Sequence, residues 1–486
     1  MRLESLIDKT DMKIYGNKNV DVCGLSDSSL TCKPGDIFFA ISGTKVDAKE
    51  FALDAVKRGA VAVVSNVKLN LPKHVANVVC KNDRKAMSYI SASFYGFPSK
   101  ELFIVGVTGT NGKTTSTFML ESIFKNAGKK VGIIGTNGVF VSGEKIVTNM
   151  TTPDPIVLQN VLAIMRDNGV QVVCMEISAH ALELQKNWGV MTDIALFTNL
   201  TQDHLDFFLN MQNYYKAKAK LFTPENAIIG VVNVDNKFGK KLYKESKIPM
   251  LTYSLYENSR ASIFASEIFQ TENGQTFNVT VLGEKQKVNL KLSGLFNISN
   301  ALASIGAGFI YGLKLDAIIS GLEKLEEVDG RFNCYDINGI KAVIDYAHTP
   351  DGLENILKSA KQMSGDHKLY SVFGCGGNRD SLKRPIMGKI SEELAEFTII
   401  TSDNPRFEKP EDIAKDIESG MKKSNHTIII DRESAIFKAF SLAKAGDVIV
   451  ISGKGSENYI DQNGEKRFYQ DKNVVMKIKK QISGNN

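Results

Sequence analysis

The stretch that decides the fold is Ile104-Val105-Gly106-Val107-Thr108-Gly109-Thr110-Asn111-Gly112-Lys113-Thr114-Thr115. It begins as a short apolar run typical of a strand and passes into a glycine-rich loop. Apolar residues with helical spacing follow and end at Gly128; they are Met119, Leu120, Ile123, Phe124 and Ala127. A strand, a glycine loop and a helix N-terminus in this order predict a phosphate site, because backbone N–H groups and the positive end of the helix dipole converge there.

Within this loop, we expect Lys113 to reach the terminal phosphates of ATP and the Thr114 hydroxyl to bind magnesium. The general phosphate-loop pattern has a glycine five residues before Gly112, whereas this chain has Val107 there. A tight turn in a buried sheet is therefore the alternative interpretation of the loop taken alone. The predicted ATP-binding residues of the loop are Gly109, Thr110, Asn111, Gly112, Lys113, Thr114 and Thr115.

Length and composition limit the possible classes of protein. A chain of 486 residues predicts about three domains, at roughly 150 residues each. The net charge of +6 is small for this length and no dense Lys/Arg block occurs, so nucleic-acid binding is not indicated. Six cysteines without a C-x-x-C pair fit reduced thiols better than disulfides or a zinc site. We find no signal peptide and no run of about 18 apolar residues, and expect a cytoplasmic monomer without a membrane span.

Apolar runs without alternation recur in the middle of the chain and predict a parallel sheet buried on both faces. Ligands of such sheets lie beyond the carboxyl ends of the strands, where this chain has Glu176, Ser178 and His204. A carboxylate and a neutral imidazole beside Thr114 suit magnesium, which takes few protein ligands plus phosphates and waters. A solvated strand cap is the alternative for Glu176 alone. The runs are 103–107, 131–134, 170–175, 194–197 and 228–234.

Two further α/β domains are predicted on either side. Near the N-terminus, strands are expected at 36–41 and 61–64 and a helix at 51–57, followed by a linker at 95–99. In the last third, four apolar runs each end in a polar loop, which predicts one pocket at one end of a sheet; they are 341–344, 369–373, 397–401 and 447–451. The expected fold class is α/β, with a central P-loop-type ATPase domain between a small N-terminal domain and a Rossmann-like C-terminal domain, at 1–97, 98–331 and 332–486.

These motifs resemble the Mur ligase family, which builds the peptide stem of the bacterial cell wall. Thr-Gly-Thr-Asn-Gly-Lys-Thr at 108–114, Met-Glu-Ile-Ser-Ala-His at 175–180 and Thr-Asn-Leu-Thr-Gln-Asp-His-Leu-Asp at 198–206 match its phosphate and metal motifs. The resemblance covers nearly the whole chain in order. It implies an ATP-dependent amide ligase of peptidoglycan precursor synthesis that works through an acyl phosphate with two Mg²⁺ ions. The implied catalytic residues are Lys113, Glu176, His204 and Lys218.

Lys218 lies in a segment, 214–222, that carries three lysines. Taken alone, three lysines on a helix predict a solvated face. The resemblance places Lys218 at the family lysine that carbon dioxide carbamylates, and a carbamate supplies carboxylate-like oxygens for a second magnesium ion. The implied metal ligands are Thr114, Glu176, His204 and Lys218 as a carbamate.

The resemblance also assigns nucleotide contacts outside the loop. The pattern Gly-x-x-Asn-x-x-Asn places Asn297 and Asn300 near the adenine of ATP. Arg331 is an expected phosphate contact, and Asp345 is expected on the ribose or phosphate side of ATP.

The N-terminal domain and residues 149–153 resemble the parts of the family that hold UDP-N-acetylmuramoyl-L-alanyl-D-glutamate. The chain departs from the usual family residues in three places: Ser29 replaces arginine, Met150 replaces asparagine, and Lys186 replaces an arginine, which loses bidentate geometry. The implied contacts are Ser26, Ser28, Thr44, Lys45, Val46, Thr151, Thr152, Ser178 and Lys186.

Asp-Asn-Pro-Arg at 403–406 resembles the form found in family members that add meso-diaminopimelate. The guanidinium of Arg406 would pair with the distal carboxylate, which lysine lacks. Ser456 replaces the common histidine, so L-lysine and meso-lanthionine stay open as substrates. A folylpolyglutamate-synthetase-type ligase and a non-catalytic nucleotide-binding module stay open as rival functions. The implied diaminopimelate contacts are Arg379, Asp403, Asn404, Pro405, Arg406, Gly453 and Glu457.

Overall fold

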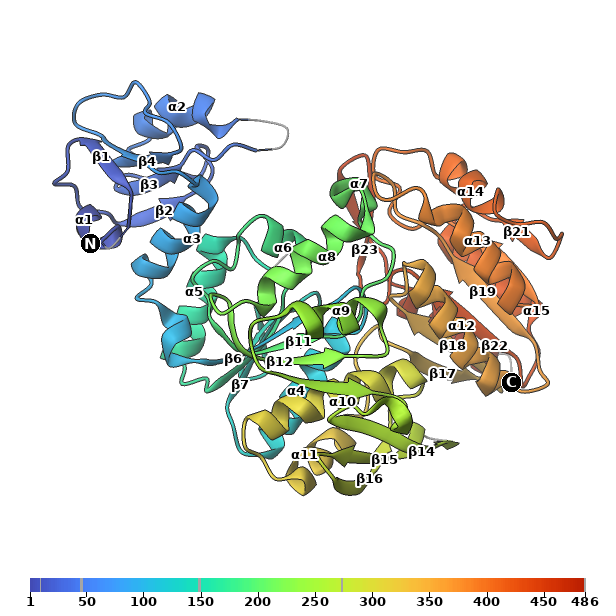
Figure 1. The fold of residues 1–486 in the computed structure, drawn as a ribbon. Coiled ribbons are helices and arrows are strands. Elements are labelled where there is room, and N and C mark those ends of the chain that lie inside the picture. The colour runs from blue at the N-terminus through green and yellow to red at the C-terminus, as the bar shows by residue number, and fades with distance from the viewer. Residues whose placement is uncertain (9, 44–46, 147–149, 272–273, 485–486) are drawn as a thin grey trace.

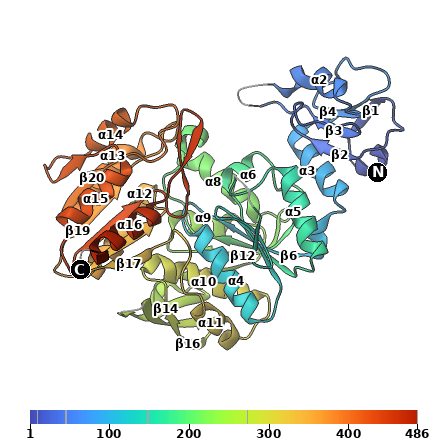
Figure 2. The ribbon, with the colours of Figure 1, turned by 180° about the vertical axis from the view of Figure 1, so that it is seen from behind.

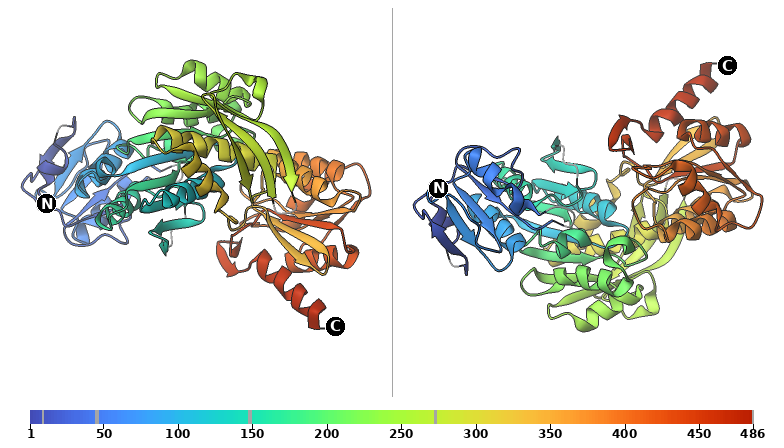
Figure 3. Two further views of the ribbon diagram at one scale, coloured as in Figure 1. Left: turned by 90° about the horizontal axis from the view of Figure 1, so that it is seen from below. Right: turned by 90° about the horizontal axis from the view of Figure 1, so that it is seen from above.

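Three sheets organise the chain into three α/β domains (Figure 1). They are a five-stranded sheet near the N-terminus, an 11-stranded sheet in the middle and a six-stranded sheet near the C-terminus. The domains lie in a row, with the two chain ends at opposite sides of the molecule (Figure 3). The predicted fold class is confirmed, and the boundaries after residues 97 and 331 stay predictions. The computed structural model describes residues 1–8, 10–43, 47–146, 150–271 and 274–484.

The N-terminal sheet has the order β1-β5-β4-β3-β2, with β1 antiparallel to β5 and the other neighbours parallel. Ile37 and Phe39 pack against α3 on one face, and Phe38 packs against α2 on the other. The predicted helix at 51–57 begins as a 3₁₀ turn and continues as α2. The elements are α1 (Leu3–Leu6), β1 (Lys13–Gly16), β2 (Gly24–Ser26), β3 (Asp36–Phe39), α2 (Ala52–Lys57), β4 (Ala62–Ser65), β5 (Ala76–Val79) and α3 (Asp83–Phe94).

The middle of the central sheet is parallel, in the order β13-β12-β11-β6-β10-β7. Val105 and Val107 of β6 pack against α4, α10 and α11, whereas Ile104 packs on the opposite face against α5. Both faces are covered, which explains the continuous apolar runs. The elements are β6 (Phe103–Thr108), α4 (Lys113–Asn126), β7 (Val131–Gly135), α5 (Pro155–Asp167), β10 (Val172–Glu176), β11 (Thr192–Phe197), β12 (Ala227–Asn233), β13 (Met250–Ser254), α10 (Leu295–Ile310) and α11 (Leu315–Glu323).

Further strands extend this sheet at both edges, which the apolar runs did not predict. β8 and β9 add antiparallel beyond β7, while β14 pairs parallel with β13 and begins an antiparallel meander with β15 and β16. In β15 the buried residues Phe277, Val279 and Val281 alternate with partly exposed ones, as expected for a sheet with one covered face. The added strands are β8 (Gly138–Val141), β9 (Glu144–Ile146), β14 (Ile263–Thr271), β15 (Gly274–Val281) and β16 (Glu284–Leu290).

Four short helices follow the carboxyl ends of β10, β11 and β12 on the upper side of the central domain in Figure 1. They are α6 (Ala179–Glu183), α7 (Leu205–Phe208), α8 (Met211–Ala219) and α9 (Lys237–Glu245). Of the helices in the described part of the chain, none combines the length and apolar character needed to span a bilayer.

The C-terminal sheet has the order β17-β18-β22-β19-β20-β21, parallel except for β17. Helices α12, α13 and α14 cover one face, and α15 and α16 cover the other, as Figure 2 shows for α15 and α16. The elements are β17 (Asn333–Ile337), β18 (Ile340–Asp345), α12 (Pro350–Ser364), β19 (Leu369–Phe373), α13 (Lys383–Leu394), β20 (Phe397–Ile400), α14 (Pro410–Glu418), β21 (His426–Ile428), α15 (Arg432–Leu442), β22 (Val448–Ser452), β23 (Tyr459–Gln462), β24 (Glu465–Phe468) and α16 (Asp471–Gly484).

A buried ion pair joins the two helices on that second face. Arg432 at the start of α15 makes two contacts of 2.8 Å with the Asp471 carboxylate at the start of α16, and neither side chain is exposed. The same guanidinium donates to the carbonyl of Ser452 at 2.9 Å. The pair therefore connects α15, α16 and the end of β22, where one of the predicted pocket loops begins.

Asp471→Ala should lower the free energy of unfolding by about 3–5 kcal/mol, because a buried guanidinium loses its counter-charge. Lys477→Ala is the matched control, since Lys477 pairs with Glu433 between the same two helices at the exposed surface. That variant should lose at most about 1 kcal/mol. Urea unfolding followed by circular dichroism measures both. Equal, small losses would contradict a structural role for the buried pair.

Candidate active site

The glycine loop joins β6 to the N-terminus of α4 as predicted. Gly112 has φ +87°, and a Cβ atom there would lie 2.3 Å from Asn300 Oδ1. A Cβ atom on Gly109 would lie 1.8 Å from Thr198 Oγ1. Residues of α10 and of the segment after β11 thus pack closely against the loop, so that only glycine fits at these two positions. This packing holds the backbone N–H groups at the start of α4 in place.

Two lysine side chains converge on one carbonyl of this loop. Lys113 Nζ donates to the carbonyls of Gly109 and Thr110, each at 2.9 Å, and Lys218 Nζ donates to Gly109 at 2.8 Å. Lys218 is buried, so the solvated-face alternative is wrong for this lysine. Desolvation lowers the pKa of Lys113; desolvation and then nearby Lys113 hold the pKa of Lys218 well below its usual value. Both effects favour the neutral amine of Lys218 over its ammonium form.

The Glu176 carboxylate at the end of β10 is buried and accepts several hydrogen bonds. Its Oε1 accepts from Thr114 Oγ1 and from the Thr136 N–H, both at 2.9 Å, and its Oε2 accepts from Thr136 Oγ1 at 3.1 Å. Arg331 Nη2 donates to Thr114 Oγ1 at 2.9 Å. The solvated-cap alternative for Glu176 is thus wrong, and the carboxylate lies directly beside the first turn of α4.

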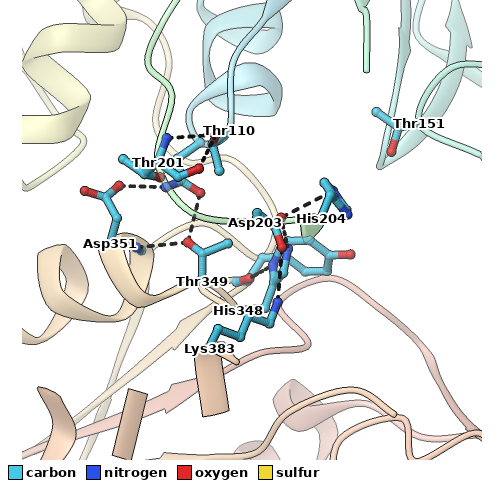
Figure 4. Close-up of polar contacts among 12 residues, drawn as sticks. Thr110, Thr151, Thr201, Asp203, His204, His348, Thr349, Asp351 and Lys383 are labelled. Carbon is cyan, nitrogen blue, oxygen red and sulfur yellow. Dashed lines mark hydrogen bonds and ion pairs between the residues drawn. The ribbon is translucent and has the colours of Figure 1, made fainter. Parts of the chain in front are cut away.

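A second cluster follows β11 and is centred on Asp203 (Figure 4). Asp203 lies 3.3 Å from His204 Nε2, 3.3 Å from Lys383 Nζ and 3.7 Å from His348 Nε2. Burial alone would raise the pKa of Asp203, but Lys383 and the two histidines hold it well below its usual range. Burial lowers the pKa of His204 to about 3, against the opposite effect of Asp203, so the imidazole is neutral. A neutral imidazole can bind a metal ion.

Contacts between the central and C-terminal domains bring the two predicted sites together. Asn111 Nδ2 of the glycine loop donates to Asp351 Oδ2 at 2.7 Å, and Thr349 Oγ1 donates to Asn111 Oδ1 at 3.4 Å (Figure 4). Ser456 Oγ donates to Asn137 Oδ1 at 2.9 Å. Together with the contacts of Asp203, these bonds place the strand-end loops of the C-terminal sheet opposite the glycine loop.

The other predicted nucleotide residues lie around this junction. Asn297 Nδ2 donates to the Ser293 carbonyl at 2.7 Å, and Asn300 Nδ2 donates to Asn297 Oδ1 at 3.3 Å, so the pair lies on the first turns of α10. Asp345 accepts from the backbone N–H groups of Phe332 and Ala347 at 2.8 and 2.7 Å. Burial raises the pKa of Asp345.

The residues predicted to hold the UDP-muramoyl dipeptide fall into two groups. Thr151 and Thr152 lie at Glu176: Thr151 Oγ1 is 3.0 Å from Thr136 Oγ1, and Thr152 Oγ1 donates to the Glu176 carbonyl at 2.9 Å and accepts from the Ser178 N–H at 3.0 Å.

The second group consists of Lys186, Ser26 and Ser28. Lys186 pairs with Asp154 at 2.8 Å. In the N-terminal domain, Ser26 Oγ donates to the Ser28 carbonyl at 2.8 Å. Burial and then the nearby Asp154 raise the pKa of Asp27, so this loop faces the Lys186 region. Thr44, Lys45 and Val46 lie outside the described residues.

The Asp-Asn-Pro-Arg loop meets the loops after β19 and β22 in one pocket wall. Lys454 is fully buried and donates to Glu457 Oε2 at 2.7 Å and to Asn404 Oδ1 at 3.1 Å. Arg406 Nη1 donates to the Gly377 carbonyl at 2.7 Å. Arg379 is exposed at the rim and donates to the Asn378 carbonyl at 3.3 Å.

At two glycines of this wall, neighbouring atoms lie so close that a side chain would clash. A Cβ atom on Gly453 would lie 2.5 Å from Asp403 Oδ2, and one on Gly377 would lie 2.0 Å from the Pro405 carbonyl. These three strand-end loops thus bring cations and carboxylates together, and the pocket itself stays a prediction.

Several residues of the site were missing from the predicted set. They share the property that a partner far along the chain defines their role: Thr136, Asp203, His348, Asp351, Lys383 and Lys454. A signal existed for three of them, because Asp203, His348 and Lys454 lie inside motifs at strand ends. Thr136, Asp351 and Lys383 have no such signal.

The donor set around the glycine loop fits magnesium bound together with phosphates. No group of three or more His, Cys, Asp and Glu side chains gathers as a metal site in the parts of the chain that the structure describes. Thr114 and Glu176, however, present hydroxyl and carboxylate oxygens 2.9 Å apart at the start of α4. Magnesium is commonly held by one or two carboxylates plus phosphate oxygens and waters, so a complete protein cage is not required.

Comparison with known proteins agrees with this geometry. The chain matches the family models of the Mur ligase middle domain over residues 107–308 and of the Mur ligase, glutamate ligase domain over residues 330–455. A relative from Clostridium tetani (strain Massachusetts / E88), named UDP-N-acetylmuramoyl-L-alanyl-D-glutamate--2,6-diaminopimelate ligase, is 40% identical over 485 residues, covering 98% of this chain and 99% of the relative.

Solved structures agree as well. One, of a UDP-N-acetylmuramoyl-L-alanyl-D-glutamate--2,6-diaminopimelate ligase, has a TM-score of 0.68 and 32% identity and covers 95% of both chains. A Mycobacterium tuberculosis folylpolyglutamate synthase complexed with ADP and AMPPCP has a TM-score of 0.64 at 16% identity, covering 76% of this chain and 92% of the other, which shows likeness of fold alone. In this three-domain α/β protein, a glycine loop at a helix N-terminus faces the polar strand-end loops of a second sheet. The chain belongs to the Mur ligase family.

Gly112→Ala should raise the KM for ATP at least about tenfold, because displacing the loop by about 1 Å misplaces the phosphates. Gly128→Ala at the other end of α4 is the matched control: it also has positive φ, +73°, but has no atom within 4 Å of the added Cβ. The control should lose about 1–2 kcal/mol of stability and keep the KM for ATP. Initial rates of ADP release measure both. A normal KM in Gly112→Ala would contradict the assigned phosphate site.

Proposed function

We propose that this protein is the ATP-dependent ligase that joins meso-diaminopimelate to UDP-N-acetylmuramoyl-L-alanyl-D-glutamate in the cytoplasm, acting as a monomer. The observation that carries the proposal is the junction at Asn111 and Asp203. It sets the glycine loop against the C-terminal pocket that contains Arg406. A nucleotide phosphate and an amino acid bound at these two places would meet across one cleft.

The first step is phosphoryl transfer to the free carboxylate of the UDP-muramoyl dipeptide. A carboxylate oxygen attacks the γ-phosphorus of ATP, the bond to ADP breaks, and an acyl phosphate forms. Such transfer depends on positioning and on electrostatic stabilisation rather than on covalent help from the protein. Lys113 exchanges its hydrogen bonds to the two loop carbonyls for contacts with the phosphates. The N–H groups at the start of α4 orient the phosphates. Arg331, beside Thr114, adds a second positive charge.

Two magnesium ions, when bound, neutralise phosphate charge; Thr114, Glu176, His204 and a carbamate on Lys218 would hold them. The carbamate requires a neutral amine, because only the free electron pair of nitrogen adds to carbon dioxide. Burial of Lys218 lowers its pKa and so favours that neutral form. The carbamate oxygens would also place a further negative charge beside Lys113.

The second step forms the amide bond. The amine of the incoming amino acid attacks the acyl carbon, a tetrahedral intermediate forms, and phosphate leaves as the carbonyl is restored. Both substrates must be held in contact, and the contacts of Asn111 and Asp203 hold the domains at that distance. Opening of these contacts is then needed to release products, so domain motion is expected to limit turnover.

The remaining residues are assigned to the two organic substrates. Ser26, Ser28 and the 44–46 loop are assigned to the UDP-sugar. Thr151, Thr152, Ser178 and Lys186 are assigned to the muramoyl peptide. Lys454 already lies beside both Asp403 and Glu457, at 3.9 and 2.7 Å. Arg406 and Arg379 are therefore assigned to the substrate's carboxylates, and a substrate with two carboxylates suits these two arginines better than lysine does.

The experiment that tests this proposal is an amino-acid panel with ADP release as the readout. ATP, Mg²⁺ and UDP-N-acetylmuramoyl-L-alanyl-D-glutamate are supplied with meso-diaminopimelate, meso-lanthionine or L-lysine; folate with glutamate tests for a folylpolyglutamate-synthetase-type ligase. Diaminopimelate should give the highest kcat/KM, and Lys113→Ala should abolish release. Highest activity with lysine or folate, or full activity of Lys113→Ala, would refute the proposal.

Arg406→Ala should raise the KM for diaminopimelate at least about tenfold, because a charge-assisted pair is worth about 1.5–3 kcal/mol. The KM for ATP should change less than twofold. Arg467→Ala on the exposed strand β24 is the matched control for the loss of one positive charge and should leave both values unchanged. An equal rise in both KM values for Arg406→Ala would count against the amino-acid pocket.

A further inference from the structure

Asp461 on strand β23 lies against the 403–406 loop through both of its backbone groups. Its N–H donates to Asn404 Oδ1 at 2.9 Å, and its carbonyl accepts from the Arg406 N–H at 2.9 Å. Asn463 N–H donates to the Arg406 carbonyl at 2.6 Å. Arg406 itself has φ +51°, a conformation that a side-chain-bearing residue adopts only where its surroundings hold it. The β23–β24 hairpin therefore fixes the backbone from which the Arg406 side chain projects.

The Asp461 side chain faces the same arginine. Its Oδ2 lies 3.9 Å from Arg406 Nε, an ion pair without a hydrogen bond. Its Oδ1 is buried and accepts no hydrogen bond from any described residue. A carboxylate in such surroundings is costly unless a cation stands nearby. Arg406 is that cation, so the two side chains constrain each other.

The guanidinium of Arg406 has part of its donor set engaged by the protein. Nη1 donates to the Gly377 carbonyl at 2.7 Å, and Nε faces Asp461. Among the described residues, Nη2 makes no hydrogen bond. A carboxylate ligand takes two parallel N–H bonds from a guanidinium whose plane is fixed. The hydrogen bond to Gly377 holds one end of the guanidinium, and the charge of Asp461 attracts its Nε side.

The other carboxylates of the pocket have different partners. Lys454 lies 2.7 Å from Glu457 and 3.9 Å from Asp403. Glu408, further along the same loop, pairs with Arg384 at 2.9 Å. Asp461 is thus the carboxylate that the structure places on Arg406, and it belongs to none of the motifs that carry the resemblance to the family.

We infer that Asp461 is a positioning residue that sets the amino-acid specificity of the pocket. It orients the Arg406 guanidinium, so that the free N–H groups face the distal carboxylate of diaminopimelate. This inference rests on the proposed function. Without Asp461, the guanidinium keeps its charge but loses its orientation, so a substrate with a distal carboxylate loses affinity. A substrate without that carboxylate, such as L-lysine, loses nothing.

Asp461→Asn tests this role, because asparagine keeps the shape of the side chain and both backbone contacts but removes the charge. The KM for meso-diaminopimelate should rise about tenfold. The kcat and the KM for ATP should stay within twofold, and the ratio of kcat/KM for diaminopimelate to that for L-lysine should fall by a similar factor. Glu465→Gln, on the exposed strand β24 of the same hairpin, is the matched control and should match the wild type. Asp461→Glu should restore part of the affinity.

An unchanged KM for diaminopimelate in Asp461→Asn would overturn the inference. A parallel loss of kcat, of ATP affinity and of thermal stability would also overturn it, because it would show a structural role only. Failure of the proposed function looks different: the wild-type enzyme itself would then release no ADP with diaminopimelate.

Discussion

The carbonyl oxygen of Gly109 accepts hydrogen bonds from two lysine side chains, Lys113 and Lys218, at 2.9 and 2.8 Å. Two ammonium groups this close, with little water around them, repel each other strongly. Burial and the nearby Lys113 lower the pKa of Lys218, which weakens this repulsion. In the proposed function, a triphosphate at the glycine loop and a carbamate on Lys218 would add negative charge here. Glu176, buried beside Thr114, completes the charge balance.

The position of the C-terminal domain likewise depends on contacts between charged side chains. Asp203 lies within 4 Å of Lys383, His204 and His348, and Lys383 and His348 come from the far side of the cleft. Because such contacts are few and polar, they can form and break during a reaction cycle, unlike the apolar cores inside each domain. The geometry of the cleft therefore rests on a small number of side chains, whereas the geometry of each half rests on its sheet.

Much of this was predictable from the sequence. The strands around the glycine loop are buried on both faces, so they appear as unbroken apolar runs, and the polar residues at their ends mark the site. The antiparallel edge strands were not predicted, because unbroken apolar runs mark only strands covered on both faces, whereas β15 alternates apolar and polar residues. Lys218 was predicted from family resemblance; helix geometry alone offers a hint, since Lys218 lies about 200° around the helix from exposed Lys216. The contacts of Asn111 with Asp351 and of Asp203 with Lys383 join residues 240 and 180 positions apart, which no local pattern reveals.

The most direct measurement is a crystal structure of the protein with a non-hydrolysable ATP analogue, Mg²⁺, the UDP-muramoyl dipeptide and meso-diaminopimelate. The γ-phosphate should lie within hydrogen-bond distance of Lys113, with magnesium between it, Thr114 and Glu176. The distal carboxylate of the amino acid should lie on the Arg406 guanidinium. A nucleotide bound away from Thr114 and Glu176, or an amino acid bound away from Arg406, would contradict the assignment of both halves of the cleft.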